Sequence, residues 1–362
     1  MKRIVSFIAV LFLLIMSGCS DYHEINDTAM VSGIAIDREG EKSYRVSAEI
    51  IQPAGSDQAS TGAKVISEEG NSMEDCLNRM VNSATKDLHF THCKLVLFSQ
   101  KIAEDGISDF VDTFLRDPRF RADLYLAVVA EGKASDMLRV GEQDDRICSF
   151  DFASVIENSY TETGSVPPTQ LYQFFMDGDL SMLPSFAESE GCYSVCGVVG
   201  FRKGIACGNL DLRLTQSMLL VSGEYRRGEL ILTPENGNSV PCQIRSVAVK
   251  KKISEADGIT VSVQIQCKIR LTSLPKEIDI ATEKNLQKTE AELSRLLTEK
   301  LKSDWNRARG NGMEDFFGLS VYVYRHDPNL LEKRKSEGQI SFEPTCSVIL
   351  ENFGFTDERI SE

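Results

Sequence analysis

The sequence predicts an α+β protein of two to three mixed α/β domains, ending in an antiparallel sheet packed on one long helix. Three features of the 362-residue chain lead to this prediction. Strand-like and helix-like segments alternate up to about residue 140, strand-like segments dominate after residue 190, and an amphipathic helix runs from about 282 to 309. With 42% hydrophobic and 26% charged residues, the composition is that of packed globular domains.

The beginning of the chain predicts an export signal over residues 1–18. Residues 4–16 are apolar apart from one serine, Lys2 and Arg3 precede them, and a pair of small residues follows. This order gives a basic n-region, a hydrophobic h-region and a small-residue cleavage zone. A membrane span needs about 20 apolar residues, so this run is too short to be one. We expect the segment to be removed on export.

Cys19 follows the small pair directly, at the position where a bacterial lipoprotein carries its lipid. We predict lipidation of Cys19; the alternative is an ordinary secreted protein whose early cysteine is a coincidence. Two or three acyl chains hold a protein on a bilayer, whereas one binds only marginally. The formal net charge of −14 repels anionic headgroups and nucleic acid, so we expect the membrane contact to depend on the lipid and predict no nucleic-acid partner.

In the N-terminal region, residues 20–190, the patterns predict strands and helices in alternation. Apolar residues recur from Met73 onward at the spacing of one helix face, and Ser72 stands where an N-cap belongs. The helix that follows ends before Pro118, because the residue preceding a proline avoids helical conformations. In the three-domain interpretation the region divides near residue 140. The predicted order is strand 30–37, strand 44–52, helix 73–88, strand 94–99, helix 107–115, strand 123–130, helix 134–139 and two helical segments between 150 and 178.

The C-terminal region, residues 191–362, predicts a mainly antiparallel sheet. From Ile259 to Leu271 every second residue is apolar without exception, which indicates a strand with one buried face. Leucines recur along one side of residues 282–309, down to Trp305, and predict one long helix that packs on this sheet. The predicted strands are 196–201, 212–222, 229–233, 242–251, 259–271, 318–325 and 346–350.

The sequence shows no catalytic or metal-binding pattern. His89 and His92 form an HxxH pair, but no further ligands accompany them at the spacing of a metal site, so we expect a packing or hydrogen-bonding role. Cys192 and Cys196 have three intervening residues, whereas zinc ribbons favour two. The motifs GxSxG, HExxH, GxxxxGK[ST] and GxGxxG do not occur. We therefore predict that the protein is not an enzyme and uses neither a metal nor a cofactor.

The cysteine count argues against a disulfide framework. With Cys19 acylated, an odd number is left, so complete pairing is impossible. Most of them lie in apolar segments, where cysteine behaves as a small buried hydrophobic residue. We expect mainly free thiols and leave one bridge open. These cysteines are Cys76, Cys93, Cys148, Cys192, Cys196, Cys207, Cys242, Cys267 and Cys346.

Several blocks along the chain are similar to those of one family. It resembles the Ger(x)C family, the lipoprotein C subunits of bacterial spore germinant receptors, over essentially its whole length. Two departures are Ser20, where the family usually has tryptophan, and the absence of tryptophan after Pro328. The blocks are Cys19 followed by EIND and VSGIAID, HCKLVLFS from His92, RDPRFR from Arg116, CGVVGF from Cys196 and EDFFGL from Glu314.

The resemblance implies a non-enzymatic subunit of three α+β domains, anchored by lipid to the outer face of the spore inner membrane. It also implies assembly with two integral membrane partners, the germinant receptor A and B subunits. Glu24, Asn26 and Asp27 follow the lipid site, so we expect them to contact these subunits or, equally, to cap the first strand. The alternative class is a solute-binding lipoprotein of a membrane transporter. Such proteins usually repeat strand and helix through two lobes, whereas the alternation here stops near residue 190.

Overall fold

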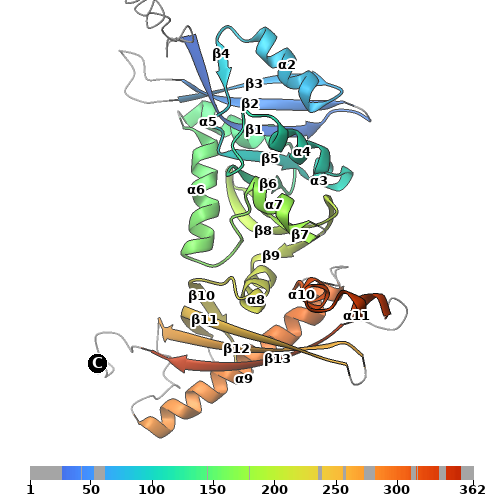
Figure 1. Cartoon of the computed structure of the whole chain (residues 1–362). Helices are drawn as coiled ribbons and strands as arrows, with labels where there is room; N and C mark the ends of the chain where they lie inside the picture. Colours follow the sequence, from blue (N-terminus) through green and yellow to red (C-terminus); the bar gives the residue numbers. More distant parts are fainter. Residues whose placement is uncertain are drawn as a thin grey trace, which may run out of the picture.

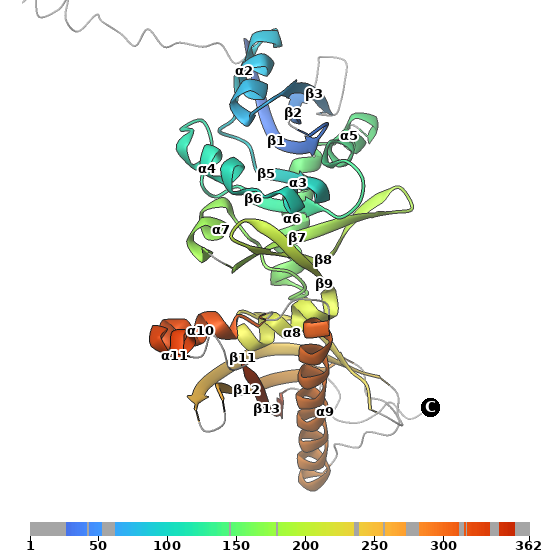
Figure 2. The same ribbon diagram turned by 90° about the vertical axis from the view of Figure 1, so that its right-hand side faces the viewer.

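Two β-sheets, one of nine strands and one of four, carry the fold and lie at opposite ends of the molecule (Figures 1 and 2). The mixed α/β class with a C-terminal sheet and a long helix is confirmed. The computed structural model describes residues 27–41, 43–52, 62–144, 146–178, 180–234, 239–255, 258–272, 282–310, 315, 317–333 and 340–351.

The first sheet has a parallel centre and antiparallel flanks. Its strand order is β3-β2-β1-β5-β6-β7-β8-β9, and β4 pairs with the beginning of β1. The pairs β1–β5, β5–β6 and β6–β7 are parallel, whereas β1–β2, β2–β3, β7–β8 and β8–β9 are antiparallel. The strands are β1 Thr28–Arg38, β2 Tyr44–Gln52, β3 Gly62–Gly70, β4 Asp87–His89, β5 Leu95–Ser99, β6 Tyr125–Val129, β7 Leu180–Ser189, β8 Cys192–Arg202 and β9 Ile205–Asp211.

Helices cover both faces of this sheet. One face packs against α2, α3, α4 and α7, with Phe98 and Phe114 in its core. The other face packs against α5 and α6, with Phe152 and Phe186 in its core. Parallel strands need cover on both sides, which explains why β5 and β6 are apolar apart from Ser99 at the end of β5. The helices are α2 Met73–Ser83, α3 Gln100–Asp105, α4 Ser108–Arg116, α5 Ala134–Asp144, α6 Cys148–Thr161 and α7 Leu171–Asp177.

Two buried carboxylates on the strands fix α5 and α6 to the sheet. Asp37 of β1 accepts hydrogen bonds from the amides of Ala134 and Ser135, at 2.6 and 3.0 Å. Glu49 of β2 accepts the first two amides of α6, at 2.7 and 3.0 Å. The first amides of a helix have no partner within the helix, and they lie at its positive end. Each carboxylate therefore satisfies these donors and has its own charge stabilised by them.

The second sheet packs on the long helix α9, Glu283–Gly310, as predicted. Its strand order is β10-β11-β12-β13, and Leu293, Leu297, Leu301 and Trp305 of α9 lie in its core. The first three strands are antiparallel. β13 runs parallel to β12, because α9, α10 and α11 carry the chain across before it re-enters the sheet. The elements are β10 Gly228–Leu232, β11 Val240–Ser254, β12 Thr260–Leu271, β13 Ser341–Leu350, α10 Leu319–His326 and α11 Pro328–Lys333.

Two predicted strands are helices in the structure. Residues 212–222 form α8, Leu212–Ser222, which is capped by Asp211 and ends at Gly223 in a left-handed conformation. This helix lies between the two sheets and is buried on most sides, so its apolar run shows no helical stripe. Residues 318–325 form most of α10, where tertiary packing overrides the strand preference of alternating valine and tyrosine. The predicted helix 73–88 ends earlier, at Ser83.

The sequence-based boundary at residue 190 falls at the turn of the β7–β8 hairpin. The first sheet therefore continues through this point to Asp211, and the change from one sheet to the other occurs at α8. The internal break near residue 140 falls within α5.

Side chains of α9 close the outer edge of the second sheet. The amide of Val348 in β13 donates to Ser294 Oγ at 2.9 Å. The amide of Cys346 donates to Thr298 Oγ1 at 3.1 Å, and that of Leu350 to Glu290 Oε1 at 2.8 Å. These acceptors are four residues apart on one helix face, and they meet every second amide of the strand. The edge is thus protected from pairing with another chain.

Removing one of these acceptors should destabilise the fold. We expect Ser294→Ala to lower the free energy of unfolding by about 1–3 kcal/mol, because the Val348 amide loses its partner. Urea denaturation measures this. Ser303→Ala, an exposed serine on the same helix, is the matched control and should leave the midpoint unchanged. Equal midpoints for the two variants would contradict the role of Ser294.

Six of the nine cysteines that the structure describes are buried, so their thiols should react more slowly than the exposed ones. Burial raises the pKa of the Cys93 thiol to about 12 and that of Cys76 to about 11, whereas Cys192 is exposed. In a Cys19→Ala chain at pH 8, Ellman's reagent should modify Cys192 quickly and Cys93 only after unfolding. Since the folded thiols keep their protons longer than unfolded ones, stability should fall as the pH rises above about 8.5.

A Cys192→Ser chain is the control for this reaction, and its fast phase should be smaller by one thiol, because Cys207 is exposed as well. Immediate modification of all thiols in the native protein would contradict the buried placement.

Candidate functional site

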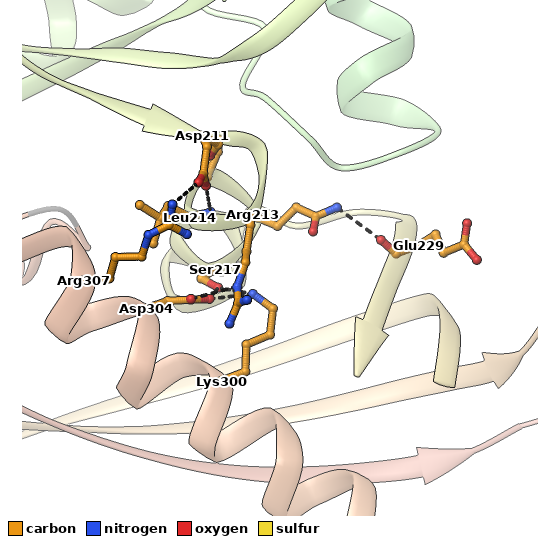
Figure 3. A network of polar contacts seen from close by, with 10 residues as sticks. Asp211, Arg213, Leu214, Ser217, Glu229, Lys300, Asp304 and Arg307 are labelled. Atoms are coloured by element: carbon orange, nitrogen blue, oxygen red, sulfur yellow. Dashed lines mark hydrogen bonds and ion pairs between the residues drawn. The ribbon is translucent and has the colours of Figure 1, made fainter. Parts of the chain in front are cut away.

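A buried carboxylate at the junction of α8 and α9 is the centre of a polar network (Figure 3). The side chain of Asp304 on α9 is only 1% exposed. It accepts a hydrogen bond from Ser217 of α8 at 2.7 Å and forms ion pairs with Lys300 Nζ at 2.6 Å and Arg213 Nε at 3.0 Å. Lys300 also donates to Ser217 Oγ at 2.9 Å. One carboxylate therefore joins two helices.

Two cations meet the buried carboxylate at the centre of this network. Arg213 and Lys300 share the single carboxylate of Asp304. Burial lowers the pKa of Lys300, Asp304 opposes this effect, and the neighbouring guanidinium of Arg213 adds to it. Asp211 also favours the charged form of Lys300, so two carboxylates oppose the effect of burial on this ammonium group.

A second carboxylate connects the first sheet to the same two helices. Asp211, the last residue of β9, is the N-cap of α8 and accepts the Leu214 amide at 2.8 Å. Its other oxygen accepts a hydrogen bond from Arg307 of α9 at 2.6 Å. The end of the first sheet, α8 and α9 are therefore linked through polar contacts that Figure 3 shows side by side.

A groove of about 550 Å³ lies beside the network. Its walls are α8 with Arg213 and Gln216, α9 with Leu296 and Lys300, and the strand β10. Charged groups of both signs line it, Arg213 and Lys300 as well as Glu229 and Glu299.

Breaking the Asp304 network should destabilise the junction strongly. Asp304→Asn leaves Lys300 buried without its counter-charge, and losing one partner of a buried ion pair costs about 3–5 kcal/mol. Chemical denaturation of the two chains measures the difference. Glu292→Gln, which removes an exposed ion pair from the same helix, should leave the midpoint unchanged. A stable Asp304→Asn chain would show that the pair does not hold the junction.

The predicted site residues belong to the first 27 residues of the sequence. Cys19, Glu24 and Asn26 are outside the described residues. Asp27 is the first described residue; it is exposed and directly precedes β1. The sequence analysis missed Asp304 because a Lys300–Asp304 pair at i,i+4 is typical of a solvated helix face, and only the packing of α8 buries it.

The histidine pair does not belong to a metal site in the described part of the chain. His89 is on β4 and His92 lies in the turn that follows. Among the residues that the structure describes, no three histidine, cysteine, aspartate or glutamate side chains gather as a metal site would need. Nor does any helix there combine the length and hydropathy required to cross a bilayer.

The fold and the two-sheet arrangement define a known structural class. The crystal structure of the GerBC protein matches with a TM-score of 0.55 at 18% identity, covering 88% of this chain and 97% of that chain. The likeness therefore extends over both sheets.

Sequence comparison identifies the family. Residues 21–179 match the spore germination protein N-terminal domain, and residues 197–354 match the spore germination B3/GerAC-like C-terminal domain. The chain belongs to the Ger(x)C family of spore germination proteins. Spore germination protein GerQC of Bacillus cereus is 20% identical over 297 residues, 80% of this chain and 81% of that protein. Spore germination protein KC of Bacillus subtilis is 28% identical over 174 residues, so the match spans 46% of this chain but only 43% of that relative.

Proposed function

We propose that this protein is a non-enzymatic, lipid-anchored subunit of a spore germinant receptor. It resides on the outer face of the spore inner membrane and assembles with the A and B integral membrane subunits. The observation that carries the proposal is the match of both family domains, in order, over residues 21–179 and 197–354. The shared GerBC fold supports it.

The anchor follows from the N-terminal sequence. Cleavage before Cys19 leaves that residue as the lipidated end, and eight peptide steps separate it from Asp27. A chain extends at most about 3.5 Å per residue, so the beginning of β1 stays within about 30 Å of the lipid. Glu24, Asn26 and Asp27 belong to the segment tethered next to the bilayer, and we propose them as contacts with the membrane subunits.

The role of the folded body is to hold and couple the membrane subunits. The Asp304 network uses its charged groups to join helices, which is a structural task. A tether confines the body to the membrane, where meeting another membrane protein becomes effectively intramolecular and is favoured without any new contact. A lipid-anchored scaffold therefore requires only modest contact surfaces.

The anchor is tested by Cys19→Ala. Produced without the A and B subunits, this variant should move from the membrane to the soluble fraction, because the body has no lipid and a net charge of −14 for the full chain. Fractionation and immunoblotting measure the shift. Cys192→Ala is the matched control and should stay on the membrane. If Cys19→Ala alone also stays there, lipid at this residue is not the anchor.

A further inference from the structure

The short helix α7 carries apolar side chains on its solvent side as well as on its core side. Leu171 and Phe174 are buried in the core of the first sheet. Tyr172, Phe175 and Met176, at the i, i+3, i+4 spacing of one helix face, are 44%, 60% and 73% exposed. A surface helix normally carries polar residues on that side. These three residues, the α7 patch, therefore form a candidate contact surface.

The α7 patch lies at the edge of the first sheet where β1 begins. The first residue of β5 pairs with Gly33 of β1 on one side and with Tyr125, the first residue of β6, on the other, and all three strands are parallel. At this edge the amide of Leu171 donates to the carbonyl of Leu124 at 2.9 Å. Two strand spacings across the sheet and five residues along β1 thus separate Thr28 from the beginning of α7, roughly 20 Å in all.

The tether brings the bilayer within reach of this patch. The chain between a lipidated Cys19 and Asp27 spans at most about 30 Å, whereas α7 begins only roughly 20 Å from the beginning of β1. The patch can therefore touch the bilayer while the lipid stays inserted. Figure 2 shows α7 on the outside of the molecule, along one side together with α4, α10 and α11.

The charges around α7 balance, although the full chain carries a net charge of −14. Arg121 and Asp123, next to the beginning of α7, pair with each other at 2.7 Å. With this pair, the described charged residues that line the hollows at the two ends of α7 are the cations Lys94, Arg121, Lys251 and Arg325 and the anions Asp123, Glu157, Asp177 and Glu224. Equal numbers of both signs leave the patch without the repulsion from headgroups that the whole chain experiences. Tyrosine and phenylalanine are also side chains that favour the membrane interface.

We propose that the α7 patch rests in the interfacial layer of the bilayer that holds the lipid, so that the first sheet faces the membrane along its amino-terminal edge. This inference rests on the proposed function, because it takes Cys19 to be the lipid anchor. Three side chains add to the tether without replacing it, since their contact is favoured only once the body is confined to the membrane. The Cys19→Ala chain should therefore still leave the membrane.

Tryptophan fluorescence on vesicles tests the proposal. Full-length lipidated chain with Phe175→Trp is inserted through its lipid into phosphatidylcholine vesicles whose acyl chains are brominated close to the headgroups, because bromine quenches tryptophan on contact. We expect the added emission to fall about twofold relative to unbrominated vesicles, and to do so equally at high salt, since the patch is neutral. The unmodified chain, whose single tryptophan Trp305 is buried, supplies the background.

Matched variants separate contact of the patch from general proximity to the membrane. Ile231→Trp puts the reporter at an exposed isoleucine of β10 in the second sheet and should be quenched severalfold less. Adding Met176→Ser to the Phe175→Trp chain should reduce the quenching severalfold, whereas Met176→Leu should retain it, because leucine remains apolar. The melting temperature should stay the same in both chains, since the Met176 side chain lies largely in solvent.

The contrary outcomes are distinguishable. If the reporter at Phe175 is quenched no more than the one at Ile231, the proposal is overturned, and the proposed function stands as long as the chain stays on the vesicles and copurifies with the A and B subunits. A crosslink to a subunit in spore membranes from p-benzoylphenylalanine in place of Phe175, without quenching in vesicles, would assign the patch to a protein contact. If the unmodified chain carries no lipid, the proposed anchor fails and this inference fails with it.

Discussion

The charge on Asp304 is the constraint on which the connection between the two halves depends. A carboxylate that is almost fully buried must be paired, and here its partners come from both α8 and α9. Because α8 begins at the last strand of the first sheet and α9 is the helix on which the second sheet packs, satisfying this charge connects the two sheets through the pair α8–α9. Asp211 reinforces the same junction through Arg307.

Much of the fold follows from local patterns. The alternation from Ile259 to Leu271 and the stripe of the long helix identify β12 and α9, because each has one buried and one wet face. The strand prediction fails for residues 212–222, since a helix enclosed between two sheets has no polar face to reveal its period. The direction of β13 is likewise hidden, because it depends on how three helices return the chain to the sheet.

The candidate sites also differ in whether the local sequence predicts them or only the folded structure reveals them. Lipidation at Cys19 is a matter of spacing along the chain, so it can be proposed from sequence. The Asp304 network requires the placement of α8 against α9, which is not a property of any short segment.

β13 is the last strand of the second sheet to be synthesised, and this order affects the folding of the new chain. The strand that covers β12 lies near the end of the chain and is separated from its partner by α9 to α11. Until residues 341–350 have left the ribosome, one side of β12 remains unpaired and the capping groups of α9 have no strand to meet. A chain truncated before this segment would therefore keep an unpaired edge on β12. Such an edge promotes aggregation, so proteases would have to remove the truncated chain.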